Sequence, residues 1–285
     1  MNNTIVFRSC LYVPGHKPHL FPKAVDGECD AIMLDLEDAV PADRKDYATS
    51  AVAEILSEPI SKPTFVRVNS IASSRTESEI QAICKPGLRG VRLPKCTQRE
   101  DIQAVDRWLT ECGSSAVIHP LLESADAIER AYELATASPR ISMMGLGEAD
   151  LQAHLGTQAD GATMDTSRAK VIIASRAAEL ASPAQSVYPQ ICDLVGLRTS
   201  SIYGRKLGFV GRMCIHPNQV PIIHEVYTPS KAEIAEATEV CAAADNAVAK
   251  RASVVLTESG RFVGPPLVAI ARRTLQLAHN VTKEG

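Results

Sequence analysis

The sequence predicts a (β/α)₈ barrel followed by a C-terminal helical arm, and three observations support this fold class. Eight short apolar runs alternate with helix-like segments over roughly the first 220 residues, as is typical of a parallel sheet that closes on itself. The length of 285 residues suits one such barrel, and an apolar fraction of 45% is enough for a large core. The absence of a G-x-G-x-x-G motif after the first run weakens the alternative of an open dinucleotide-binding sheet.

The predicted strands are short apolar runs bounded by turn or helix signals. They lie at residues 9–15, 30–38, 64–69, 90–95, 116–122, 141–146, 186–189 and 208–217, of which 186–189 is the weakest. The predicted helices have apolar residues at helical spacing, and one of them begins after Pro41 and ends before Pro59. They lie at residues 16–26, 42–56, 77–84, 100–111, 124–137, 165–180 and 191–207, and the spacing in the last of these is broken.

The chain after the eighth run is surplus to a barrel. We therefore expect a barrel domain at residues 1–228 and an arm or lid at 229–285. Within the arm, an Ala-rich helix is predicted at 230–250, a small hairpin or loop at 253–262 and a final helix at 266–278. The arm could be packing decoration, a lid, or an extension that reaches a neighbouring subunit.

Composition excludes several function classes. The net charge of −3 and the lack of a basic stripe argue against nucleic acid as a partner. No apolar run of about 18 residues is present, so we expect no membrane span. The N-terminus lacks the apolar core of a signal peptide, and the eight cysteines are scattered without a C-x-x-C pair. These features predict a cytoplasmic protein with reduced thiols.

Two carboxylates are predicted to meet at one end of neighbouring strands. Glu123 and Asp150 each follow an apolar run, and the helical segment 124–137 links the two runs as in a parallel βαβ unit. Paired carboxylates suit a hard divalent cation such as Mg²⁺, with water or substrate as the remaining ligands. Alternatively, each carboxylate satisfies the free N–H groups at the start of a helix.

Further polar residues follow the strands on the same expected face of the barrel, where the active sites of this fold lie. They are Asp35, Glu37, Asp38, Arg67, Asn69, Lys95, Glu148 and His216. Arg67 stands in an apolar strand, so its guanidinium needs a partner, and a substrate carboxylate is a natural one. A structural ion pair of Arg67 with Glu37 or Asp38 is the alternative. Lys95 could form a Schiff base or lie at a solvated strand end.

Seven motifs occur in a fixed order along the chain. They read RSCLYVPG at 8–15, LDLEDAV at 34–40, FVRVN at 65–69, LPK at 93–95, PLLES at 120–124, GEADL at 147–151 and GFVGRMCIHP at 208–217. Together they resemble the citrate lyase β-subunit-like branch of the HpcH/HpaI aldolase superfamily. Each motif is weak alone, but seven in register make the resemblance specific.

This resemblance implies a (β/α)₈ barrel and a Mg²⁺-dependent lyase that splits a 3-hydroxyacyl-CoA into acetyl-CoA and a 2-oxo acid. It implies that Glu123 and Asp150 hold the metal, in agreement with the expectation from the strand ends. Arg67 would clamp the carboxylate or carbonyl oxygens of the substrate, and Glu37 would lie near the metal waters and the substrate.

The resemblance also implies how the acyl-CoA and a second subunit are bound. Lys17 and Lys23 follow the first strand, where the family places basic residues for the phosphates of CoA. Family members are commonly homotrimers, in which the C-terminal arm of one subunit closes the site of its neighbour.

The chain departs from the family pattern at the expected proton donor. Where the family has Asp in a G-x-x-x-D-x-P segment of the arm, this chain has Gly264, and a second family acid is replaced by Gln185. Glu258 or another acid could stand in, a differently placed group or water could act, or the activity could be altered.

Citramalyl-CoA, cleaved to acetyl-CoA and pyruvate, is the substrate that the resemblance favours. The rival enzyme is a citrate lyase β subunit that acts on a citryl thioester and requires partner proteins. A non-catalytic relative that keeps a metal site is a third hypothesis, for which Gly264 is the best support.

Overall fold

The computed structural model of the protein describes residues 6–250, 256–257 and 260–282. The chain divides into two compact units, Met1–His224 and Glu225–Gly285. The expected division into a barrel domain at 1–228 and an arm at 229–285 stays a prediction.

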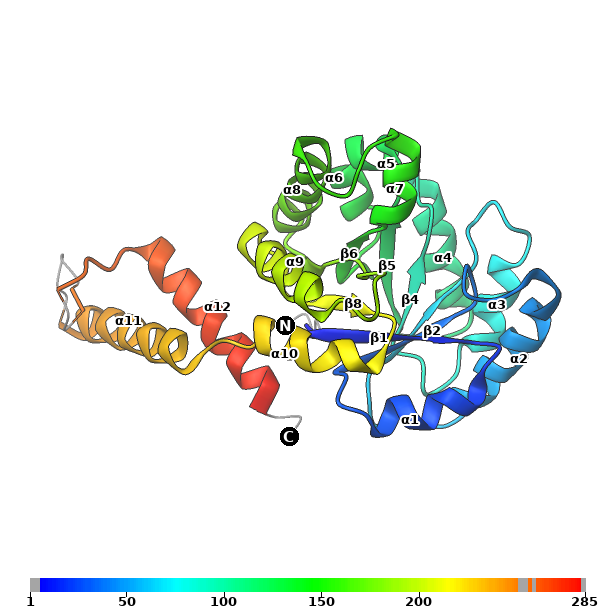
Figure 1. The fold of residues 1–285 in the computed structure, drawn as a ribbon, viewed down its shortest axis with the longest axis horizontal. Coiled ribbons are helices and arrows are strands. Elements are labelled where there is room, and N and C mark those ends of the chain that lie inside the picture. Colours follow the sequence, from blue (N-terminus) through cyan, green and yellow to red (C-terminus); the bar gives the residue numbers. More distant parts are fainter. Residues whose placement is uncertain (1–5, 251–255, 258–259, 283–285) are drawn as a thin grey trace. The chain divides into compact units, whose positions relative to one another are not determined.

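The first unit is a (β/α)₈ barrel, as the sequence predicted. Its eight strands are parallel, with neighbours in the order β7-β6-β5-β4-β3-β2-β1-β8, and the helices lie around them (Figure 1). The strands are β1 (Ser9–Pro14), β2 (Ala31–Asp35), β3 (Thr64–Arg67), β4 (Gly90–Leu93), β5 (Val117–Leu122), β6 (Met143–Leu146), β7 (Ala181–Ala184) and β8 (Arg212–Cys214).

The first and last strands of that order approach each other through a single parallel bridge, Gln185 to Arg212. The N–H of Gln185 donates to the carbonyl of Gly211 at 2.8 Å, and the N–H of Met213 donates to the carbonyl of Gln185 at 2.9 Å. A side chain at position 211 would collide with the backbone carbonyls of Phe7 and Arg8, which directly precede β1. Only glycine therefore allows the chain to pass this closely at the closure of the barrel.

The predicted position of the seventh strand was wrong. The structure places β7 at Ala181–Ala184, and residues 186–189 follow it as irregular chain. The Val-Tyr pair at 187–188 has higher β-propensity than the small residues of β7, and Pro183 lacks an N–H for a sheet. The carbonyl of Pro183 nevertheless accepts a hydrogen bond from the N–H of Val210 at 3.1 Å. Pairing with neighbouring strands overrides local propensity here.

The helices of the first unit follow the predicted order with three differences. The predicted helix at 124–137 is broken at Arg130 into two, and two helices after residue 147 and after residue 219 were not predicted. The helices and 3₁₀ turns are η1 (Pro18–Leu20), α1 (Phe21–Asp26), η2 (Ala42–Arg44), α2 (Lys45–Ile55), α3 (Thr76–Ile83), α4 (Arg99–Glu111), α5 (Ala125–Glu129), α6 (Ala131–Ala135), α7 (Glu148–Leu155), α8 (Ala162–Ala177), α9 (Leu194–Leu207), η3 (Pro217–Gln219) and α10 (Val220–Tyr227).

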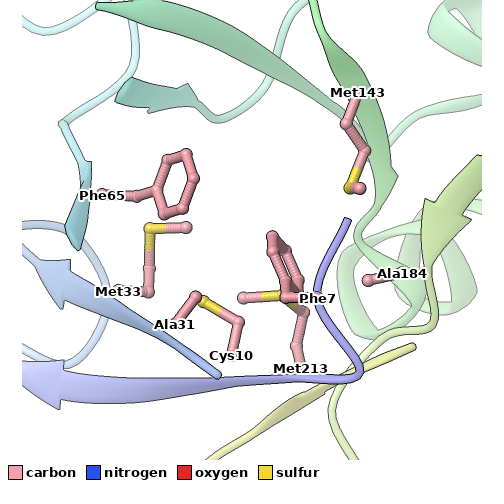
Figure 2. Packing of buried hydrophobic residues seen from close by; sticks show 8 residues of the cluster. All are labelled: Phe7, Cys10, Ala31, Met33, Phe65, Met143, Ala184 and Met213. Carbon is pink, nitrogen blue, oxygen red and sulfur yellow. The ribbon is translucent and has the colours of Figure 1, made fainter. Parts of the chain in front are cut away.

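Apolar side chains fill the interior of the barrel, as Figure 2 shows. The buried cluster consists of Phe7, Cys10, Ala31, Met33, Phe65, Met143, Ala184 and Met213. Met33 of β2 pairs in register with Phe65 of β3, and Asp35 pairs with Arg67 two residues further along. Because residues two apart on a strand face the same side, the interior face becomes charged at the carboxyl ends of the strands.

The second unit contains two helices, α11 (Lys231–Lys250) and α12 (Pro265–Thr282), which pack against each other. Ala237 and Val240 of α11 form a small apolar core with Ala271 of α12 and Val263 before it. Part of the predicted hairpin, 253–255 and 258–259, lies outside the described residues, while Leu256 bridges to Phe262. In the part of the chain that the structure describes, no helix is long and apolar enough to span a membrane.

The closure of the barrel gives a testable prediction. Gly211→Ala should lower the free energy of unfolding by about 1–3 kcal/mol, because the added Cβ would lie 2.6 Å from the carbonyl oxygen of Arg8 and closer still to that of Phe7. Urea unfolding measures the change. In the control Gly264→Ala, the nearest atom is 3.3 Å away on the Phe262 ring, so little change is expected. Equal losses in the two variants would refute the close approach.

Candidate functional site

A cavity of about 1210 Å³ opens within the first unit at the carboxyl ends of the strands. Its lining includes charged residues from five successive strands or the segments after them, together with residues of α7, α8 and α9. The charged groups closest to the predicted site are Asp35, Asp38, Arg67, Arg92, Glu123 and Asp150. The cavity therefore brings together both predicted metal ligands and Arg67.

Arg67 is held by three acids from the neighbouring strand end. Its Nε and Nη2 donate to the two carboxylate oxygens of Asp35, both at 2.7 Å. Its Nη1 lies 3.0 Å from Glu37 Oε2 and 3.3 Å from Asp38 Oδ2. Burial works against the charge of Arg67, but the hydrogen bonds and charge of Asp35 hold the pKa of the guanidinium above its usual value. The structural ion pairs considered as an alternative for Arg67 are thus present, and Asp35 is an additional partner.

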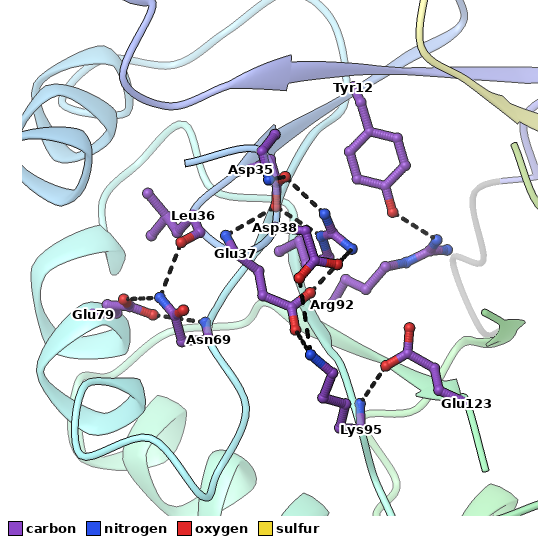
Figure 3. Close-up of polar contacts among 12 residues, drawn as sticks. Tyr12, Asp35, Leu36, Glu37, Asp38, Asn69, Glu79, Arg92, Lys95 and Glu123 are labelled. Carbon is purple, nitrogen blue, oxygen red and sulfur yellow. Dashed lines mark hydrogen bonds and ion pairs between the residues drawn. The ribbon is translucent and has the colours of Figure 1, made fainter. Parts of the chain in front are cut away.

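Glu37 is shared between two cations. Besides the contact with Arg67, its Oε1 accepts a hydrogen bond from Lys95 Nζ at 2.9 Å (Figure 3). Burial raises the pKa of Glu37 although both cations oppose the shift. Lys45 fixes the loop that carries Glu37, because its Nζ donates to the carbonyls of Leu36 at 2.7 Å and Glu37 at 2.6 Å.

Lys95 adopts a backbone conformation that is unusual for a side chain of its size. Its φ of 55° lies in the left-handed region, which costs a non-glycine residue of order 1 kcal/mol or more. In this conformation its N–H donates to Glu123 Oε2 at 2.8 Å (Figure 3). One residue thus contacts two acids of the site, Glu37 through its side chain and Glu123 through its backbone.

Glu123 is a buried acid surrounded by other negative charges. Its side chain is packed over Gly147, where a Cβ would collide with the carboxyl group. Burial, followed by the charges of Glu37 and Asp150, raises the pKa of Glu123 to about 7. Asp150, in the first turn of α7, lines the same cavity and is exposed.

The carboxylates at this position fit a divalent cation. The negative charge of Asp150 helps to disfavour the ionised form of Glu123, and a bound cation would remove that repulsion. Among the described residues, no group of three or more His, Cys, Asp or Glu side chains is arranged to hold a metal. Two protein carboxylates with water or substrate in the other positions is the arrangement that Mg²⁺ favours.

The two lysines expected to contact CoA are not among the residues that line the cavity. Lys17 precedes η1, Lys23 is in α1, and both are exposed. Both follow β1, whose carboxyl end faces the site. Their assignment to CoA stays a prediction.

Sequence reasoning missed Arg92 and Arg168 among the residues that line the cavity, and it did not predict the contacts of Gln185 and Glu148. Arg92 on β4 is buried and lines the cavity, and its only sequence signal was a charge inside an apolar run. Gln185, expected to replace a family acid, is buried and accepts a hydrogen bond from Arg212 Nη1 at 3.0 Å. Glu148 of α7, which was expected on this face, forms an ion pair with Arg168 of α8, and this contact links two helices that no local pattern connects.

Comparison with known proteins places this site in a family. A family model described as HpcH/HpaI aldolase/citrate lyase matches residues 8–217. The chain belongs to this family. The match spans the whole barrel apart from its last helix and confirms the resemblance seen in the seven motifs.

Individual members of the HpcH/HpaI family align over nearly the full chain. Citrate lyase subunit beta of Leuconostoc mesenteroides subsp. cremoris is 31% identical over 299 residues, covering 100% of this chain and 98% of the relative. A (3S)-malyl-CoA thioesterase of Cereibacter sphaeroides is 32% identical over 279 residues, covering 96% and 95%. A crystal structure of CitE from Mycobacterium tuberculosis with magnesium, acetoacetate and coenzyme A has a TM-score of 0.77 and 26% identity, covering 97% and 99%. As an HpcH/HpaI member with citrate lyase relatives, this chain is a lyase, as the sequence predicted.

The raised pKa of Glu123 predicts how the metal-free protein responds to pH. A carboxyl group whose pKa is raised from 4.5 to about 7 favours the fold while protonated, and this contribution is lost as the pH rises through about 7. Glu123→Gln should therefore stabilise the metal-free protein by about 1–3 kcal/mol near pH 8 and by little near pH 5. Thermal unfolding in a chelator at both pH values tests this. An equal effect of the substitution at the two pH values would show that the pKa of Glu123 is not raised in this way.

Proposed function

We propose that this chain is a Mg²⁺-dependent carbon–carbon lyase that cleaves a 3-hydroxyacyl-CoA into acetyl-CoA and a 2-oxo acid by retro-Claisen chemistry. The observation that carries the proposal is the convergence of Glu123, Asp150 and Arg67 on one cavity of an HpcH/HpaI barrel. The similarity to Mycobacterium tuberculosis CitE, whose crystal structure is a complex with magnesium, acetoacetate and coenzyme A, also supports it.

Glu123 and Asp150 would hold the cation. When bound, Mg²⁺ would lower the pKa of the substrate hydroxyl and stabilise negative charge on the oxygen that becomes the new ketone. Glu123 gives up a proton near neutral pH to serve as a ligand, so cation binding should weaken as the pH falls below about 7.

Arg67 would stabilise the negative charge beside that oxygen, and Glu37 would accept the proton of the hydroxyl. Asp35 fixes the guanidinium of Arg67, so its positive charge is in place before charge moves toward the breaking bond. Glu37, whose pKa burial raises, is suited to take the hydroxyl proton, and Lys95 stabilises its ionised form. The thioester enolate must then be protonated at carbon, and Gly264 and Gln185 provide no acid for that step.

The two leading candidates for the acyl group differ by one carboxylate. Citramalyl-CoA, which would give pyruvate, is the first candidate because of the motif resemblance. A citryl thioester, the substrate of a citrate lyase β subunit, is the second, supported by relatives that carry that name. In either case Lys17 and Lys23 are proposed to bind the phosphates of CoA, and a cytoplasmic homotrimer is the proposed assembly.

The direct test is cleavage of defined thioesters. Citramalyl-CoA, citryl-CoA and malyl-CoA should be incubated with the purified protein, with and without Mg²⁺, and acetyl-CoA release should be measured. We expect release from at least one of them only when Mg²⁺ is present. If none is cleaved with or without metal, the proposed reaction is wrong.

The metal ligands have a matched control in the same cavity. Glu123→Gln and Asp150→Asn should each lower kcat/KM by at least about 100-fold and weaken Mg²⁺ binding in calorimetry. Asp160→Asn removes an exposed acid that also lines the cavity, so turnover should stay within about threefold of the unmodified protein. Unchanged Mg²⁺ binding in both ligand variants would exclude these two residues as ligands.

A further inference from the structure

Arg92 is a buried cation whose carboxylate-binding edge is unpaired within the described residues. Only 2% of its surface is exposed, and its Nη1 makes a long hydrogen bond of 3.4 Å to the hydroxyl of Tyr12 (Figure 3). Within the described residues, its Nε and Nη2 have no hydrogen-bond partner. These two atoms form the side of a guanidinium that receives a carboxylate through two parallel hydrogen bonds. A buried charge without such a partner is costly, so a ligand is the natural explanation.

The neighbouring Arg67 shows how a carboxylate pairs with this edge of a guanidinium. Arg67 pairs in register with Arg92 on the adjacent strand, so the two side chains leave the sheet on the same face. The equivalent edge of Arg67 is filled by Asp35 at 2.7 Å. His119, which pairs with Arg92 on the other side, supplies no negative charge, and burial lowers its pKa to about 3.

The Arg92 side chain lines the cavity below the acids at its rim, and its Nε and Nη2 are themselves buried. Arg92 and Glu123 both line the cavity. A Cβ at Gly145 would lie 3.5 Å from Arg92 Cζ and Nη2, so the guanidinium lies level with that glycine. Gly145 pairs with Leu121, two residues before Glu123. Two strand residues span about 6.6 Å, which places Arg92 one layer deeper than Glu123.

We propose that Arg92 forms an anion subsite that binds an additional carboxylate on the acid half of the substrate. The identity of this ligand rests on the proposed function, in which one carboxylate already lies at the rim with the cation. A carboxymethyl group on the substrate carbon that bears this first carboxylate would extend one layer inward and meet Nε and Nη2 of Arg92. The subsite therefore selects an acyl group whose 2-oxo acid product is a dicarboxylate. A citryl group gives such a product, and a citramalyl group does not.

Direct binding tests the subsite independently of catalysis. Oxaloacetate and pyruvate are 2-oxo acids that differ by one carboxylate, and their affinities can be measured by calorimetry in the presence of Mg²⁺. The unmodified protein should bind oxaloacetate at least about tenfold more tightly. Arg92→Met should abolish this preference by weakening the binding of oxaloacetate but not that of pyruvate. Arg92→Lys, which keeps the charge but not the paired donors, should retain the preference only in part.

Two controls keep the result interpretable. Arg107→Met removes an exposed cation of α4 and should leave both affinities unchanged. Arg92→Met should unfold at an equal or higher temperature than the unmodified protein, since it removes a buried charge. Equal affinity of the unmodified protein for the two acids, or equal weakening of both by Arg92→Met, would overturn the proposal. A preference that depends on Arg92 in a protein that cleaves no thioester would support the subsite and refute the proposed reaction.

Discussion

The site depends on an alternating chain of charges at the carboxyl ends of strands β2 to β5. Arg67 lies between Asp35 and Glu37, and Lys95 lies on the other side of Glu37. Buried acids are tolerated only when cations or hydrogen bonds compensate for lost hydration. These pairs fix the acids of β2 in place, and Glu123 is the carboxylate that they compensate least.

The barrel separates a stabilising part from a reactive part along the same strand faces. Below Asp35 and Arg67, the inward positions are apolar, as Met33 and Phe65 are. Above them, the inward positions hold charge that the fold does not fully neutralise. Glu123 and Arg92 both disfavour the ligand-free state, Glu123 because burial and nearby negative charges oppose its ionisation, and Arg92 because the Nε–Nη2 edge of its buried guanidinium is unpaired among the described residues. Both costs are relieved by ligands of opposite sign, so ligand binding should stabilise the folded protein.

The sequence predicted the fold and the rim residues because both depend on repeated local patterns. Apolar runs that end in Asp35, Arg67 and Glu123 located the carboxyl ends of the strands, and the structure brings these residues to one cavity. Three features were not accessible from local patterns. The β7 strand is set by pairing with its neighbours, and the bidentate pair of Arg67 with Asp35 is a contact between strands. The unpaired edge of Arg92 depends on how distant segments pack around it.

The central claim is that Glu123 and Asp150 together hold a divalent cation at this rim. Mn²⁺ binds oxygen ligands much as Mg²⁺ does, and its anomalous scattering locates it directly. In crystals grown with Mn²⁺, we expect an anomalous peak at bonding distance, about 2.1 Å, from a carboxylate oxygen of each residue. A peak elsewhere, or bonding to only one of the two carboxylates, would contradict the claim.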